Sequence, residues 1–198
     1  MKRYEEALKI AEQLGDLSGN AIRLNNIGMI YQEQENYPEA LKRYEEALKI
    51  AEQLGELKNK AAYLSNIGAI YKIKENYPEA LKHFEEALKV AEQLEDLKNK
   101  ITYINNIGAI YDSQRNYPEA MKRYEEALKI IEQLEDPLGK AILLNNIGLI
   151  YYAQDNYPEA LRSFESALRI LTELGLGESP NAKIFKENIN FLKSNTNK

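Results

Sequence analysis

The chain has 198 residues, of which 44% are hydrophobic, and its formal net charge is −5 at pH 7. Lysine and glutamate are mixed along the helices rather than grouped, so the chain lacks the basic stripe with which a nucleic-acid-binding protein neutralises phosphates. It has no cysteine, which excludes disulfides and thiolate metal sites. No apolar run approaches the length that spans a bilayer, and the first residues lack the apolar core of a signal peptide. We therefore expect a soluble, cytoplasmic protein without nucleic-acid or membrane partners.

Residues 1–15 read MKRYEEALKIAEQLG, and the same pattern returns further along as the second half of a longer unit. The periodicity predicts an amphipathic helix that lacks the helix before it. One apolar face of this orphan helix would be unpartnered. We expect that it either belongs to a longer chain or meets another molecule.

A unit of about forty residues then recurs, marked by a glycine, a tyrosine three residues later, and a Tyr-Pro pair. A fixed period of roughly 20–50 residues is typical of a stacked array, in which each unit buries its apolar face against its neighbours. The glycines are Gly28, Gly68, Gly108 and Gly148. We place the four repeats at about 16–55, 56–95, 96–135 and 136–175.

Each repeat is predicted to form two antiparallel helices. In the first repeat, Asp16 is a suitable N-cap for one helix, and Pro38 opens the second. Gly28 and Ala40 carry almost no side chain, so the two helices can approach closely, while Tyr44 fills the volume beside them. The equivalent caps are Asp96, Asp136 and, more weakly, Glu56.

The turn between the two helices of a repeat has an asparagine in every copy. Asparagine enters the left-handed backbone region more readily than most residues, and that region ends many helices. We therefore predict the left-handed conformation at Asn36, Asn76, Asn116 and Asn156.

Residues 176–198 depart from the repeat. Ser179-Pro180 begins a helix predicted over about 180–194, whose apolar side comprises Ile184, Phe185, Ile189, Phe191 and Leu192. A terminal helix with a polar outer face closes arrays of this kind, and the polar side chains here are Lys183, Lys186, Glu187 and Asn190. We predict a capping helix with a disordered tail. The alternative is that this helix and the orphan N-terminal helix of a second molecule complete one another.

The spacing of Leu24, Ile27-Gly28, Tyr31, Ala40, Tyr44 and Ala47 resembles the tetratricopeptide repeat. The longer period resembles the repeats of kinesin light chain and of LGN-type polarity scaffolds, and the resemblance covers residues 1 to about 175. It implies an all-α fold, a right-handed superhelix of stacked antiparallel helix pairs whose first helices line a concave surface. The turn glycine of the family is replaced here by Glu35, Glu75, Arg115 and Asp155.

No residue pattern indicates catalysis. The single histidine, His83, takes the place of Arg43 and Arg123 in other repeats, and we expect it to be an ordinary surface residue. The sequence has no glycine-rich phosphate loop, no metal-ligand spacing and no nucleophile beside a base. We predict a protein that is not an enzyme, with no cofactor and no metal site.

The resemblance also places one asparagine of every first helix on the concave surface, and a second beside it in three of the four. An amide both donates and accepts hydrogen bonds, so it can hold the backbone of an extended peptide, and the matching asparagines do so in the resembling families. The alternative is that these amides bond one another or nearby helix carbonyls and stabilise the stack. The residues are Asn25, Asn26, Asn66, Asn105, Asn106, Asn145 and Asn146.

The remaining inner residues suggest the nature of the ligand. Their few charges, which include Lys72 and Asp112, nearly cancel, while Met29 and Tyr152 are apolar or aromatic. We predict a protein–protein interaction scaffold that binds a neutral extended peptide with apolar anchors. The alternative is a self-assembling structural scaffold, a homo-oligomer joined through its terminal helices. The sequence does not identify the partner.

Overall fold

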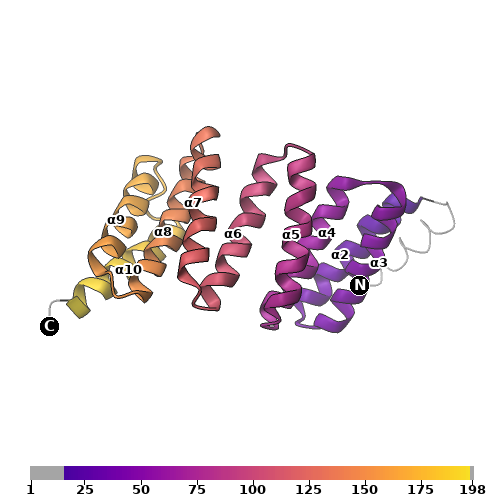
Figure 1. The fold of residues 1–198 in the computed structure, drawn as a ribbon, viewed down its shortest axis with the longest axis horizontal. Helices are drawn as coiled ribbons and strands as arrows, with labels where there is room; N and C mark the ends of the chain where they lie inside the picture. The colour runs from indigo at the N-terminus through magenta and orange to yellow at the C-terminus, as the bar shows by residue number, and fades with distance from the viewer. Residues whose placement is uncertain (1–15, 197–198) are drawn as a thin grey trace. The chain divides into compact units, whose positions relative to one another are not determined.

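A computed structural model of the chain describes residues 16–196, so the orphan helix predicted over residues 1–15 lies outside the described residues. Within the described range the fold is all-α and contains no strand. None of the helices there is long and apolar enough to cross a membrane. The helices are α2 (Leu17–Glu33), α3 (Tyr37–Leu54), α4 (Leu57–Ile73), α5 (Tyr77–Gln93), α6 (Leu97–Ser113), α7 (Tyr117–Gln133), α8 (Pro137–Ala153), α9 (Tyr157–Glu173) and α10 (Pro180–Thr196) (Figure 1).

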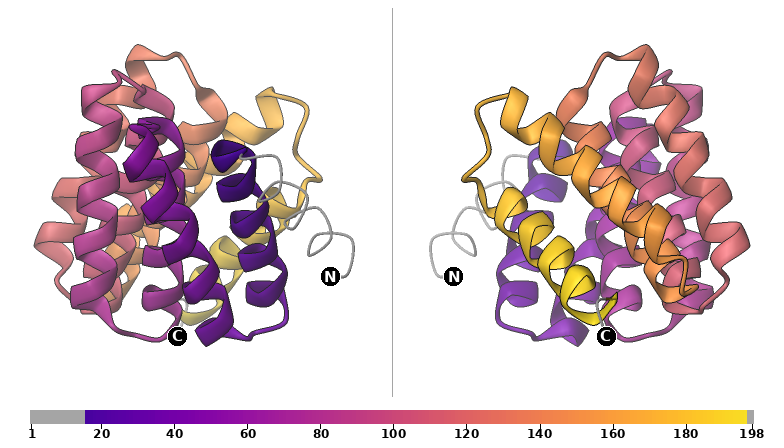
Figure 2. Two further views of the ribbon diagram at one scale, coloured as in Figure 1. Left: turned by 90° about the vertical axis from the view of Figure 1, so that its right-hand side faces the viewer. Right: turned by 90° about the vertical axis from the view of Figure 1, so that its left-hand side faces the viewer.

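The chain divides into two compact units, Met1–Tyr103 and Ile104–Lys198. In the first unit α2 packs against α3, α3 against α4, and α4 against α5. In the second unit α7 packs against α8, α8 against α9, and α9 against α10. Successive helices run in opposite directions, as the α2–α3 hairpin shows in the left view of Figure 2. The predicted all-α fold of stacked antiparallel helix pairs is confirmed.

The two helices of a hairpin meet where the repeat glycine faces an aromatic ring. A Cβ atom added at Gly28 would lie 2.6 Å from Cε1 of Tyr44, and one added at Gly148 would lie 2.6 Å from Cε1 of Phe164. Ala40 and Ala160 are fully buried beside these rings. The predicted close approach at glycine and alanine is therefore present in both units.

The N-caps behave as their side chains predict. Asp16 accepts a hydrogen bond from the backbone N–H of Gly19 at 2.9 Å, Asp96 from Asn99 at 3.1 Å, and Asp136 from Gly139 at 3.0 Å. Glu56 makes no such bond to the first turn of α4; its carboxylate instead accepts from Nδ2 of Asn59 at 2.6 Å. The glutamate is thus the weaker cap, as expected.

The prediction for the turn between the helices was wrong by one residue. Glu35 is in the left-handed region with φ of 57°, whereas Asn36 has φ of −83° and is the N-cap of α3. The backbone N–H of Asn36 donates to the carbonyl oxygen of Tyr31 at 2.8 Å, and the backbone N–H of Glu35 donates to the carbonyl oxygen of Gln32 at 2.9 Å. This is the six-to-one closure of a Schellman motif, in which the residue before the last donor takes the positive φ. Asn76, Asn116 and Asn156 likewise have negative φ, and the left-handed residues are Glu75, Arg115 and Asp155.

Helix α10 buries one side against the other helices of the second unit and exposes part of its apolar side. Phe185, Ile189 and Leu192 are buried, and the right view of Figure 2 shows α10 lying against α9. Ile184 and Phe191 are 48% and 55% exposed. Of the predicted apolar side, Phe185, Ile189 and Leu192 therefore form the buried face, whereas Ile184 and Phe191 lie outside it.

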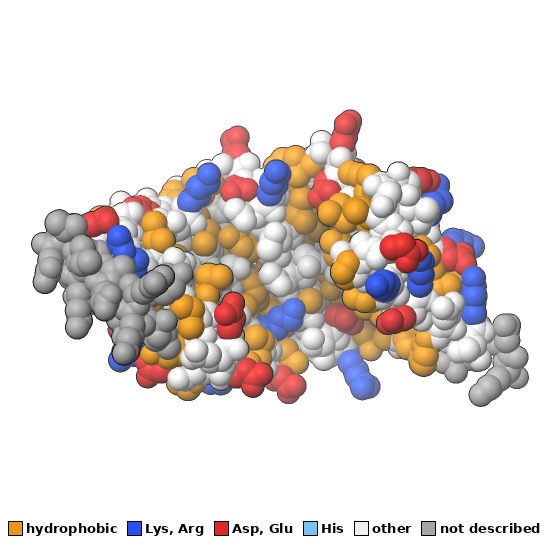
Figure 3. All heavy atoms as spheres, turned by 180° about the vertical axis from the view of Figure 1, so that it is seen from behind, with side chains coloured by type: hydrophobic (Ala, Val, Ile, Leu, Met, Phe, Trp, Pro, Cys, Tyr) orange, Lys and Arg blue, Asp and Glu red, His pale blue; other side chains and the backbone are white. Residues whose placement is uncertain are grey.

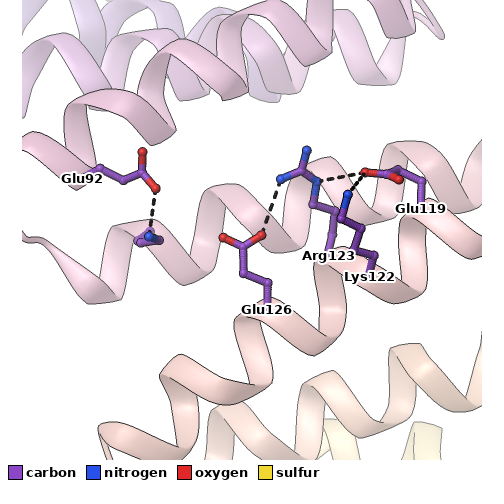
Figure 4. A network of polar contacts seen from close by, with 6 residues as sticks. Glu92, Glu119, Lys122, Arg123 and Glu126 are labelled. Atoms are coloured by element: carbon purple, nitrogen blue, oxygen red, sulfur yellow. Dashed lines mark hydrogen bonds and ion pairs between the residues drawn. The ribbon is translucent and has the colours of Figure 1, made fainter.

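Ion pairs between partly exposed side chains connect neighbouring helices. In each pair, a lysine in the first turn of α4, α6 or α8 contacts a glutamate near the end of the helix that precedes it in the chain. Figure 4 shows Glu92 in one such pair, and a separate group on α7 in which Arg123 lies between Glu119 and Glu126. The lysine–glutamate pairs are Lys60–Glu52 at 3.1 Å, Lys100–Glu92 at 2.8 Å and Lys140–Glu132 at 2.9 Å.

Candidate peptide-binding surface

In the first unit, two of the predicted site asparagines are bonded to each other. Nδ2 of Asn66 on α4 donates to Oδ1 of Asn25 on α2 at 2.7 Å, and both side chains are half-buried. Nδ2 of Asn25 also contacts the sulfur of Met29 at 3.7 Å. Asn26, the neighbour of Asn25 in the sequence, is half-buried as well.

The second unit repeats this amide pair twice. Nδ2 of Asn146 on α8 donates to Oδ1 of Asn105 on α6 at 3.1 Å. Nδ2 of Asn188 on α10 donates to Oδ1 of Asn145 at 2.9 Å, and Asn145 is only 7% exposed. Asn106 is half-buried.

Asn188 was not predicted as a site residue. It lies two positions before Asn190, which takes the place of the repeat glycine, just as Asn146 lies two positions before Gly148. The loop before α10 is longer than its counterparts, so Asn188 does not fall on the forty-residue spacing. An alignment on the glycine position would have found it.

The three amide pairs are the arrangement that the alternative interpretation described, in which the asparagines bond one another. Each pair uses one donor of one amide and one acceptor of the other. An asparagine side chain has two N–H donors and an oxygen with two lone pairs. Each paired amide therefore has further hydrogen-bonding groups that the pair itself does not use.

A cavity of about 370 Å³ lies at one end of α2 in the first unit. The hydroxyl of Tyr44 donates to Oε1 of Gln32 at 2.9 Å within it. Burial of the ring, and secondarily the charge of Glu33, raise the pKa of Tyr44 to about 12, so this phenol is neutral at pH 7. The lining residues are Met29, Gln32, Glu33, Glu35, Tyr37, Tyr44, Asn66 and Ile73.

Several large apolar side chains on α2, α4 and α10 are about half exposed. Met29 and Ile73 are 48% and 51% exposed in the first unit, and Phe191 is 55% exposed in the second. Tyr152 packs edge-on against Phe191 with ring centroids 5.8 Å apart. On the face seen in Figure 3, apolar side chains lie between separated acidic and basic ones rather than beside a continuous basic area.

Two predicted charged site residues, Lys72 and Asp112, are half-buried at the ends of their helices. Neither side chain is without a partner. Both therefore take part in interactions within the protein.

His83 is not the ordinary surface residue that we expected. Its ring stacks on Tyr71 with centroids 5.6 Å apart and planes 3° from parallel, and burial lowers its pKa. Tyr71 on α4 covers one face of the imidazole, which the sequence alone could not reveal. Among residues 16–196 no three His, Cys, Asp or Glu side chains are grouped so that they could hold a metal ion.

Several solved structures are similar to this chain at low sequence identity. BtubC (BKLC) from P. vanneervenii matches with a TM-score of 0.76 and 19% identity over 99% of this chain and 90% of its own. Aspartyl phosphate phosphatase F from Bacillus subtilis matches with a TM-score of 0.80 and 16% identity over 98% of this chain and 55% of its own. A Rap protein complexed with Competence and Sporulation Factor matches with a TM-score of 0.66 and 21% identity over 82% of this chain and 45% of its own. The chain thus spans about half the length of the phosphatase and of the Rap protein, and these likenesses establish the fold alone.

Sequence comparison establishes the family. No curated protein sequence matches the chain. One tetratricopeptide repeat family model matches residues 2–53 and 59–133, and a second tetratricopeptide repeat model matches residues 141–177. These matches cover most of the sequence and include the glycine and aromatic positions at which the helices meet. The chain belongs to the tetratricopeptide repeat family.

Proposed function

We propose that the chain binds an extended peptide segment of a partner protein on the face formed by its first helices. Tetratricopeptide repeats are typically non-catalytic scaffolds for protein–protein interaction. Our proposal goes beyond this general role and names the surface that contacts the partner. The observation that carries it is the set of amide pairs beside exposed apolar side chains. Paired amides offer backbone hydrogen bonds, and apolar side chains such as Met29 offer anchoring contacts.

The spacing of packed helices suits an extended ligand. Helices in contact lie roughly 8–10 Å apart, and an extended strand advances about 3.3 Å per residue. Successive first helices would therefore meet about every third residue of the peptide. A peptide of about ten residues is long enough to contact both first helices of one unit.

A related complex supports a peptide or protein ligand. The Rap protein that resembles this chain was solved with Competence and Sporulation Factor bound to it. Its fold therefore accommodates a bound partner. The low identity carries over no contact residue, so the residues proposed here rest on the present structure.

The proposal can be tested before the natural partner is identified. Phage-displayed random peptides of about ten residues are selected on the intact chain, and the affinity of a synthetic copy is measured by fluorescence anisotropy. The variant Asn66→Ala/Asn106→Ala should weaken binding by tenfold or more, since each lost hydrogen bond contributes about 1 kcal/mol. The exposed pair Glu45→Ala/Glu125→Ala is the matched control and should bind normally.

Because Asn66 also bonds Asn25, a second variant separates binding from stability. Met29→Ser/Leu149→Ser changes side chains that are 48% and 40% exposed. It should reduce affinity while the melting temperature stays near that of the parent chain. Unchanged affinity in both variants would reject the proposed surface.

A second candidate function is self-assembly through the terminal helices. The observation in its favour is that Ile184 and Phe191 on the last helix are about half exposed. Sedimentation velocity of the chain beside Ile184→Ser/Phe191→Ser tests it. An assembly that the double substitution dissolves would support this candidate, whereas a monomer at all concentrations would eliminate it.

A further inference from the structure

We infer that the cavity at the end of α2 receives a lysine or arginine side chain of the bound peptide, with Glu33 and Glu35 as its charge partners. This inference rests on the proposed peptide-binding function and specifies the chemistry of one ligand residue. It adds a basic residue to the neutral, apolar-anchored peptide that the sequence suggests.

The charges lining the cavity have one sign. Glu33 and Glu35 are exposed carboxylates, and no lysine or arginine is among the described residues that line it. A ligand cation would therefore find two anions and no competing base. An acidic ligand group would be repelled.

The neutral lining groups also favour a cation. The carbonyl oxygen of Asn66 can accept a hydrogen bond, because Asn66 bonds Asn25 through Nδ2. The hydroxyl of Tyr44 donates to Gln32, which leaves the phenol oxygen as an acceptor toward the cavity it lines. Since Tyr44 is neutral at pH 7, it brings no charge of its own. These acceptors suit the several N–H donors of an ammonium or a guanidinium.

The apolar part of the lining fits the rest of such a side chain. Lysine and arginine bury a hydrocarbon stem and keep the charged head at a polar site. Met29 and Ile73 both line the cavity and are about half exposed, so they can cover that stem. A cavity of about 370 Å³ leaves room for one long side chain.

This combination is specific to the first repeat. The residues equivalent to Glu33 are Ile73, Ser113 and Ala153, and those equivalent to Glu35 are Glu75, Arg115 and Asp155. Only the first repeat has a carboxylate at both positions. The basic residue of the ligand would therefore have one place along the array, which would fix the register of the peptide.

The test compares peptides selected from the same random library on the intact chain and on Glu33→Gln/Glu35→Gln. Glu75→Gln is the matched control, because Glu75 has the same left-handed backbone as Glu35 and does not line this cavity. The selected peptides from the parent chain and the control should share a lysine or arginine at one position. The double variant should lose that preference.

One selected peptide then enters a double-mutant cycle, with arginine or lysine at the shared position replaced by the uncharged analogues citrulline or acetyl-lysine. Either change alone should weaken binding about tenfold, and the second change should add little once the first is made. Two outcomes would overturn this inference and leave the proposed function intact. One is a set of peptides that bind well but share no basic residue. The other is a shared basic residue whose contribution to affinity is unchanged in Glu33→Gln/Glu35→Gln. Failure to select any peptide on the parent chain would overturn both.

Discussion

Substitution of the repeat glycines by alanine tests the helix packing, because the four positions are not equivalent. A Cβ atom at Gly28 would lie 2.6 Å and 2.7 Å from two carbons of the Tyr44 ring. The same atom at Gly68 would lie 3.2 Å from the nearest carbons of Phe84. The first contact is impossible without a shift of the ring or the helix, whereas the second requires only a slight adjustment.

The magnitude follows from two opposing effects. Alanine is favoured over glycine inside a helix by about 1 kcal/mol, whereas overpacking of a filled core lowers stability by about 1–3 kcal/mol. Tyr44 cannot give way easily, because its ring is fully buried and its hydroxyl is bonded to Gln32. We expect Gly28→Ala to lower the free energy of unfolding by about 1–2 kcal/mol, and Gly68→Ala to change it by less than about 0.5 kcal/mol.

The assay is equilibrium unfolding in guanidinium chloride, followed by circular dichroism, with the slope of the transition compared between variants. Tyr44→Phe frees the ring from Gln32, so the effect of Gly28→Ala should be smaller in that background. A Gly28→Ala chain as stable as the parent, or a Gly68→Ala chain that loses more than Gly28→Ala, would refute the packing argument.

Three further predictions concern charge and capping. Lys60→Met removes a lysine that pairs with two glutamates at 3.1 Å and 2.8 Å, and should lower the free energy of unfolding by about 1 kcal/mol, less at high salt. Burial raises the pKa of Tyr44 and of Tyr63 to about 12 from 10.0, so the folded state holds protons that the unfolded state releases. Stability should therefore fall between pH 10 and 12, by at most about 1.4 kcal/mol per pH unit for each ring, and less in Tyr44→Phe. Asp136→Ala should lower stability by about 1 kcal/mol and Glu56→Ala by less, as measured by the same unfolding assay, because only the aspartate accepts a bond from a backbone N–H of the first turn.

The sequence predicted those features that depend on local patterns present in every forty-residue repeat. Helix positions followed from apolar spacing, the N-caps from aspartate, and the close approach at Gly28 from the absence of a side chain. Each of these depends on residues within one hairpin. The left-handed turn residue was assigned to Asn36 because of the preference of asparagine, but backbone closure onto Tyr31 places the positive φ at Glu35.

Contacts between side chains on different helices were harder to predict. The stacking of His83 on Tyr71 lies within one hairpin, but it depends on how α4 and α5 pack, and no local pattern encodes it. The sequence offered two uses for the asparagines, and only coordinates could show that Asn66 reaches Asn25. Asn188 was not predicted because a longer loop shifts it from the repeat spacing.

The amide pairs are compatible with the proposed peptide contacts, because the hydrogen bond in all three pairs runs in the same direction along the chain. In all three, the asparagine on the later helix donates through Nδ2 and the one on the earlier helix accepts through Oδ1. The pair bond therefore leaves the carbonyl oxygen of the later asparagine free to accept from a proposed peptide N–H, and leaves the Nδ2 group of the earlier one outside the pair bond. In the first pair, Nδ2 of Asn25 also contacts the sulfur of Met29. The bond between the paired asparagines also holds both side chains in place before a ligand arrives, which reduces the entropy lost on binding. Under the proposed function, pairing would orient these asparagines toward a peptide backbone, which carries both kinds of group.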